Sequence, residues 1–237
     1  MKYFLSVLMI LFLISCEENK PSVNLDSLKT DSALKALQSV AVPAKNDTTG
    51  MAALPIVFEG DIVLQISNDP QSIAFGNACN SKYNHAGIIF MRPKDNRYVV
   101  MEVKDSVVIT PLNEWVAKGK DGHFALLRLK HSNEILSAKK TDKLKTAAKN
   151  SRGKKYDYFY NWSDDSFYST ELVWKIYRQS LNIEICETGK LGDGDFTGTL
   201  LHGQMLKKYG LTIPKDEIFI SPEQIYKSSK LDIAYER

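Results

Sequence analysis

The chain has 237 residues, of which 43% are hydrophobic and 25% are charged, and this composition is typical of a globular protein with a real core. Its formal net charge of +3 is too small to indicate a nucleic-acid partner. The four histidines are isolated and no cysteine–histidine cluster has zinc spacing, so we expect no metal site and no cofactor.

The N-terminal region has the pattern of an export signal followed by a tether. Lys2 precedes an apolar run at 4–14, which is too short for a membrane-spanning helix of about 20 residues. The run ends in Leu13-Ile14-Ser15-Cys16, which is typical of a bacterial lipobox with Cys16 as the lipidated residue. An ordinary signal peptide with a chance cysteine is the alternative. We therefore predict a signal peptide at 1–16, a tether at 17–54 with a short helix at 26–40, and a lipid-anchored location in the bacterial cell envelope, facing the periplasm or the exterior.

The remaining residues, 55–237, are predicted to form one domain in which strands and helices are mixed. Strands are expected at 61–66, 85–91, 98–103, 107–110, 124–129, 217–220 and 231–235. Helices are expected from Asp69-Pro70 to about Cys79, from Thr110-Pro111 through Trp115, from Ser132 to about Asn150, at 167–177, at 203–209 and from Ser221. Consecutive antiparallel strands that follow a helix favour an α+β fold over a doubly wound parallel sheet.

The helix at 167–177 holds the first candidate for chemistry. Ser166 is a suitable N-cap, so Ser169 should lie in the first turn, where unpaired backbone N–H groups and the positive end of the helix dipole favour a nucleophile. The structural alternative is that Ser166, Ser169 and Thr170 serve only to cap the helix.

Two residues upstream are suited to assist such a nucleophile. His85 stands where a polar turn enters a strand, and imidazole is the usual base for a hydroxyl or thiol at neutral pH. Glu102 ends the neighbouring strand of the predicted hairpin, where it can accept the second ring N–H of His85 and stabilise the imidazolium. A satisfied structural histidine and a glutamate on a solvent-facing strand are the alternatives.

Five segments in order resemble the permuted papain-like hydrolases of the NlpC/P60 superfamily, in particular the YiiX/YaeF-like group. The segments begin at Gly60, Tyr83, Tyr98, Thr110 and Phe167. The resemblance implies a circularly permuted papain-like fold, with an antiparallel sheet packed against helices. It also implies the catalytic order His85, Glu102, Ser169, and hydrolysis or transfer at an amide or ester bond of a small-molecule, peptide or acyl substrate.

The chain departs from this family at Ser169, where the family carries a cysteine. Three interpretations stay open: an active serine variant, an inactive relative that binds its former substrate, and an engineered replacement. A scaffolding lipoprotein with accidental motif matches is a further hypothesis. For the oxyanion, the backbone N–H of Ser169 is the natural donor, and Gln65, Tyr158 or Asn161 is a candidate side-chain donor. Cys79 and Cys186 are either a disulfide or two free thiols, and the oligomeric state is left open.

Overall fold

The computed structural model describes residues 54–237, which belong to one compact unit of the chain. The predicted signal peptide, Cys16, the tether up to residue 53 and the helix at 26–40 lie outside the described residues. The elements in chain order are β1 (Ile62–Ser67), α2 (Pro70–Ala78), β2 (His85–Arg92), β3 (Arg97–Val103), β4 (Val107–Pro111), α3 (Leu112–Lys118), β5 (Gly119–Leu129), α4 (Ser132–Ile135), α5 (Ala138–Ser151), β6 (Lys155–Tyr156), β7 (Ser166–Phe167), α6 (Ser169–Leu181), β8 (Gly189–Lys190), η2 (Leu191–Asp193), α7 (Leu200–Tyr209), β9 (Ile218–Phe219), α8 (Pro222–Tyr226) and β10 (Leu231–Glu236).

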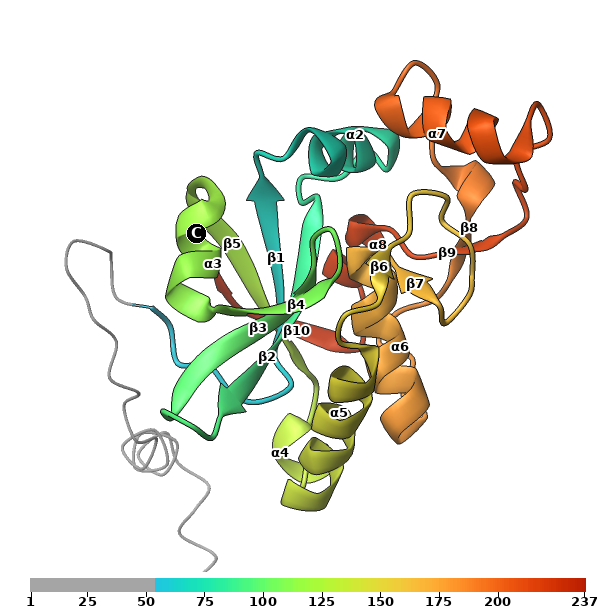
Figure 1. The fold of residues 1–237 in the computed structure, drawn as a ribbon. Coiled ribbons are helices and arrows are strands. Elements are labelled where there is room, and N and C mark those ends of the chain that lie inside the picture. The colour runs from blue at the N-terminus through green and yellow to red at the C-terminus, as the bar shows by residue number, and fades with distance from the viewer. Residues whose placement is uncertain (1–53) are drawn as a thin grey trace, which may run out of the picture. The chain divides into compact units, whose positions relative to one another are not determined.

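A six-stranded sheet organises the domain (Figure 1). Its strand order is β10-β5-β1-β2-β3-β4, and every neighbouring pair is antiparallel. Two small two-stranded sheets, β6 with β7 and β8 with β9, lie outside it. The predicted α+β fold is therefore confirmed, with an antiparallel sheet packed against helices.

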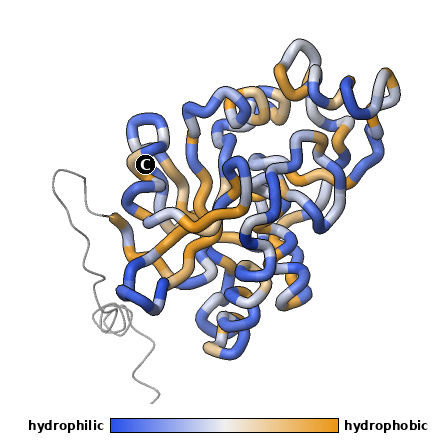
Figure 2. Tube along the Cα trace, in the orientation of Figure 1, coloured by the Kyte–Doolittle hydropathy of each residue, from blue (hydrophilic) through white to orange (hydrophobic). Residues whose placement is uncertain are grey.

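The sheet is covered on both faces, because its strands place apolar side chains alternately on each side. One face packs against α5 and α6 through residues such as Leu144, Leu172 and Ile176. The other face packs against α3 through Leu112, Trp115 and Val116. The most hydrophobic stretches of the chain accordingly follow the central strands in Figure 2. Among residues 54–237, no helix is both long and apolar enough to cross a membrane.

A third core cluster lies beside the sheet and is rich in aromatic rings. It joins α2 and α7 to the start of α6, and its centre is the Phe75, Tyr160, Tyr168 and Phe219 group. Phe75 stacks on Tyr160 with ring centroids 5.4 Å apart, and Tyr168 stacks on Phe219 at 5.5 Å. This cluster fixes the residue that immediately precedes Ser169.

Two predicted helix boundaries are wrong. The helix expected from Ser132 to about Asn150 is two helices, α4 and α5, because Leu136 leaves the helical conformation and Ser137 starts a new helix. The expected N-cap of α6, Ser166, instead belongs to β7, which pairs with β6, and Tyr168 takes the cap position. Ser166 thus pairs with β6, and local helix propensity does not predict such a pairing.

Candidate functional site

The structure brings His85 and Glu102, the predicted base and its orienting acid, into contact. Nε2 of His85 lies 2.7 Å from Oε2 of Glu102, and both side chains are buried. His85 opens β2 and Glu102 lies near the end of β3, which is hydrogen-bonded to β2. With Nε2 committed to the carboxylate, Nδ1 is the ring nitrogen left to exchange a proton.

Glu102 is held by more than its histidine. Its Oε1 accepts the Thr110 hydroxyl from β4 and lies 2.9 Å from Nζ of Lys104. Burial acts to raise the pKa of Glu102, but the hydrogen bond and charge of His85, together with Thr110 and Lys104, outweigh it and bring the pKa to about 2. Glu102 is therefore ionised near neutral pH and is able to stabilise an imidazolium.

Trp115 shields this pair from the α3 side. Its ring stacks on that of His85, with centroids 6.2 Å apart and planes 28° apart. Its backbone oxygen accepts a hydrogen bond of 2.9 Å from Nε2 of Gln65, which pairs with His85 across the β1–β2 ladder. Gln65, a candidate oxyanion donor, thus donates one amide hydrogen to Trp115, and its second amide hydrogen is left for another acceptor.

Ser169 is the first residue of α6, as predicted, and it is 4% exposed. The residues on either side of it bind the backbone of Ile220: the Thr170 hydroxyl donates to the Ile220 oxygen at 2.6 Å, and the Tyr168 hydroxyl accepts from the Ile220 N–H at 3.0 Å. The helix start is therefore held from both sides, which suits a residue whose backbone N–H must point in a fixed direction.

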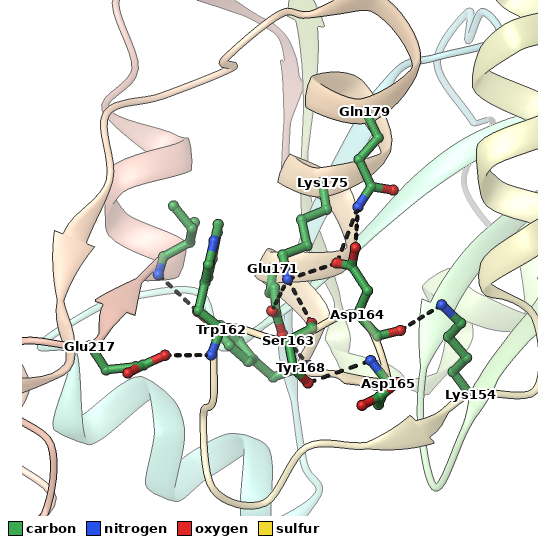
Figure 3. Close-up of polar contacts among 11 residues, drawn as sticks. Lys154, Trp162, Ser163, Asp164, Asp165, Tyr168, Glu171, Lys175, Gln179 and Glu217 are labelled. Atoms are coloured by element: carbon green, nitrogen blue, oxygen red, sulfur yellow. Dashed lines mark hydrogen bonds and ion pairs between the residues drawn. The ribbon is translucent and has the colours of Figure 1, made fainter.

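A buried ion pair holds the other side of this helix start (Figure 3). Nζ of Lys175 lies 2.8 Å from Oε1 of Glu171 and 3.0 Å from Oδ1 of Asp164, and it donates to the Ser163 oxygen at 2.6 Å. Oε2 of Glu171 accepts the Tyr168 N–H at 3.3 Å. Lys175 therefore ties the 161–165 loop to the first turn of α6.

The structure joins His85 to Glu102, but no hydrogen bond among residues 54–237 joins Ser169 to His85. A cleft of 420 Å³ lies beside the histidine–glutamate pair, and Ser169 is not one of its lining residues. Catalytic hydrogen bonds are often long before substrate binds, so this separation leaves the role of Ser169 as a prediction. Of the other two candidate donors, Tyr158 packs on Tyr156 with ring centroids 4.9 Å apart, and Oδ1 of Asn161 accepts the Tyr209 hydroxyl.

Sequence reasoning missed three residues that touch the pair. Thr110 and Lys104 both bind Glu102, and Trp115 covers His85. The segment that begins at Thr110 was recognised as a motif, but its contact with Glu102 depends on the β3–β4 register. Cys79 and Cys186 are both free thiols.

Comparisons with protein families, with curated proteins and with solved structures give consistent matches. Residues 57–235 match the model of the family described as permuted papain-like amidase, YaeF/YiiX, C92. Protein YiiX of Escherichia coli strain K12 is 34% identical over 172 residues, which cover 73% of this chain and 83% of YiiX. The crystal structure of YiiX from Escherichia coli O157:H7, described as a metalloprotein, superposes with a TM-score of 0.67 at 34% identity, covering 76% of this chain and 97% of that chain.

Proposed function

Because the chain belongs to the permuted papain-like amidases of the YaeF/YiiX family, we propose that it hydrolyses an amide or ester bond with Ser169 as the nucleophile. Membership in the family removes the hypothesis that the motif matches are accidental. The observation that carries the proposal is the 2.7 Å contact between His85 and Glu102, which supplies an oriented base.

In the proposed reaction, the Ser169 oxygen attacks the substrate carbonyl carbon while its proton passes to Nδ1 of His85. Glu102 stabilises the imidazolium, and the backbone N–H of Ser169 stabilises the oxyanion, with Gln65 as an additional donor. The C–N or C–O bond then breaks, and the leaving amine or alcohol takes the proton from His85. Water, deprotonated by His85, attacks the acyl–serine ester; the bond between the acyl carbon and the Ser169 oxygen breaks, the Ser169 oxygen takes the proton from His85, and the acid product leaves.

Serine makes this reaction harder than cysteine would. A thiol at a helix N-terminus beside an imidazole ionises readily, whereas a hydroxyl needs its proton removed during attack. The alternative function is therefore an inactive relative that binds its former substrate. That alternative is favoured by one observation: within the described part of the chain, Ser169 has no hydrogen bond to His85.

The description of YiiX from Escherichia coli O157:H7 as a metalloprotein raises the question of a metal here. Among residues 54–237, no group of three or more His, Cys, Asp or Glu side chains is placed to hold a metal ion. The described donors therefore do not fit such a site.

The proposal also includes a location for the protein and a class of substrate. We place the protein in the cell envelope through a lipid on Cys16, on the strength of the lipobox. Cell-wall peptides and lipid-linked acyl groups are two substrate classes that fit such a location.

The test does not require a known substrate. In a chain lacking residues 1–16, Cys79 and Cys186 are changed to Ala and Ser169→Cys is introduced, and the alkylation rate is measured against pH. We expect an apparent thiol pKa well below the usual value of about 8.5, and a rise toward that value when His85→Ala is added. An ordinary thiol pKa that does not respond to His85→Ala would contradict the proposed site.

Serine activity is tested separately. A fluorophosphonate probe should label the chain with serine at position 169 and should not label the Ser169→Ala variant. Absence of labelling, combined with a reactive thiol in the Ser169→Cys variant, would favour the binding-only alternative.

A further inference from the structure

The cleft beside the His85–Glu102 pair contains two lysines: Lys104, which helps to keep Glu102 ionised, and Lys118, which has no part in the proposed reaction. Its walls come from the end of β1 and the start of α2 on one side, and from the β3–β4 turn and the end of α3 on the other. Lys104 stands in the turn, and Lys118 is the last residue of α3. Both line the same 420 Å³ cleft as His85 and Glu102.

The two ammonium groups differ in their partners. Nζ of Lys104 lies 2.9 Å from Oε1 of Glu102 and 3.1 Å from the Thr110 hydroxyl. Lys118 is exposed, and no ion pair of it is found within residues 54–237. The neighbouring Lys104 lowers the pKa of Lys118, as expected of two cations held close together. Lys118 is thus a cation beside a cation, and the carboxylates of Glu102 and Glu114 attract it without forming an ion pair with it in the described region.

None of the acidic residues that line the cleft forms an ion pair with Lys118. Both carboxylate oxygens of Glu102 are occupied, by His85 on one side and by Thr110 and Lys104 on the other. Oδ2 of Asp69 accepts the Ser72 N–H at 2.9 Å and caps α2. Asp105 is exposed, and it makes no ion pair with either lysine in the described region.

We propose that Lys104 and Lys118 form an anion subsite that receives a carboxylate of the substrate beside the bond to be cleaved. A carboxylate between the two ammonium groups would gain from both charges and would relieve their mutual repulsion. The preferred substrates are therefore peptides or acyl chains that carry a free carboxylate near the scissile bond. The preference for such substrates in hydrolysis rests on the proposed hydrolase function, whereas the binding of a carboxylate does not.

A purely structural role for Lys118 makes a different prediction. A lysine in the last turn of α3 complements the helix dipole, and its loss would lower stability without changing the preference between charged and neutral ligands. The tests of the subsite therefore compare ligands of equal chain length with and without a carboxylate.

Binding is tested with succinate against neutral succinamide, in the Ser169→Ala variant lacking residues 1–16, by backbone amide NMR titration at constant ionic strength. We expect saturable shifts around Lys104 and Lys118 with succinate alone. Lys118→Gln should weaken succinate binding by about fivefold or more, Lys118→Arg should retain it, and Lys149→Gln, on the exposed face of α5, should leave it unchanged. The subsite is refuted if succinate shifts do not saturate, or if they are insensitive to Lys118→Gln.

Turnover is tested with two esters of equal length, mono-4-nitrophenyl succinate and 4-nitrophenyl butyrate. We expect the ratio of their kcat/KM values to fall about fivefold in Lys118→Gln and to be kept in Lys118→Arg. Succinate binding without Ser169-dependent hydrolysis would support the subsite and contradict the hydrolase. Ser169-dependent hydrolysis with no succinate binding and an unchanged ratio would support the hydrolase and overturn the subsite.

Discussion

His85 and Glu102 meet along a diagonal of the sheet rather than directly across it. The β2–β3 register places Glu102 opposite Gly87, two residues beyond His85, yet Nε2 of His85 and Oε2 of Glu102 are 2.7 Å apart. Diagonal neighbours on antiparallel strands are within reach of long side chains, and both residues occupy the same face of the sheet. The pair therefore depends on the close approach of β2 and β3 at Gly87.

Changing Glu102→Gln tests the charge of the pair while keeping its shape. The amide oxygen can still accept from His85, but it no longer stabilises a positive imidazolium, so we expect the rate of ester hydrolysis to fall by at least about tenfold. In the variant carrying Ser169→Cys, the alkylation rate at neutral pH should fall in parallel. The matched control is Thr110→Val, which removes a hydrogen bond and keeps the carboxylate, and its effect should be smaller. Equal rates for wild type and Glu102→Gln would contradict the assigned role.

A side chain at Gly87, which lies in β2 opposite Glu102 of β3, should destabilise the sheet. A Cβ atom at Gly87 would lie 2.2 Å from Cγ1 of Val100 and 3.0 Å from the Met101 oxygen, so β3 would have to move. We expect Gly87→Ala to lower the free energy of unfolding by about 1–3 kcal/mol, measured by urea denaturation. Gly203, an exposed glycine inside α7 with no atom within 4 Å of its Cβ position, is the control, and Gly203→Ala should raise stability by about 0.5–1 kcal/mol.

The Lys175–Glu171 pair predicts a large stability effect at a site that makes no contact with His85. Lys175 is 5% exposed and Glu171 is fully buried, so Lys175→Met leaves the Glu171 carboxyl and the Ser163 oxygen without the ammonium group that contacts them. We expect a loss of about 1–3 kcal/mol in the free energy of unfolding. Lys143→Met, on the exposed face of α5, should change it by less than about 0.5 kcal/mol. A loss below 1 kcal/mol for Lys175→Met, measured by the same denaturation, would show that Lys175 does not hold the loop.

Glu171 also predicts how stability changes with pH. Burial raises the pKa of Glu171 from 4.5 to about 8, although Lys175 acts to lower it, so the folded protein holds a proton that the unfolded chain releases. The stability from this proton is fully present below about pH 4.5 and is lost as pH rises through about 8. The stability difference between wild type and Glu171→Gln should therefore decline from pH 5 to pH 8. A difference that is independent of pH over this range would contradict the raised pKa.

Local sequence signals predicted most of the individual elements. Asp69 followed by Pro70 marked the start of α2, and the structure has that cap, with the Asp69 carboxylate accepting from Ser72. Ser169 was placed in the first turn of its helix, where α6 begins. One error arose where pairing between strands overrode a local preference, because β6 paired with Ser166 and removed it from the helix cap. The other arose at Leu136, where the chain leaves the helical conformation between α4 and α5.

The sequence by itself determined the α+β class, the family resemblance, and the three residues proposed for catalysis, because periodicity, caps and ordered motifs are local properties of the chain. Only the tertiary structure decided that His85 binds Glu102, that Thr110 and Lys104 share that carboxylate, and that Lys118 stands in the same cleft. These contacts depend on strand register and on the packing of α3 against the sheet. The physical reason is that such long-range contacts are selected by burial over the whole fold, and local sequence patterns do not encode which distant residues meet.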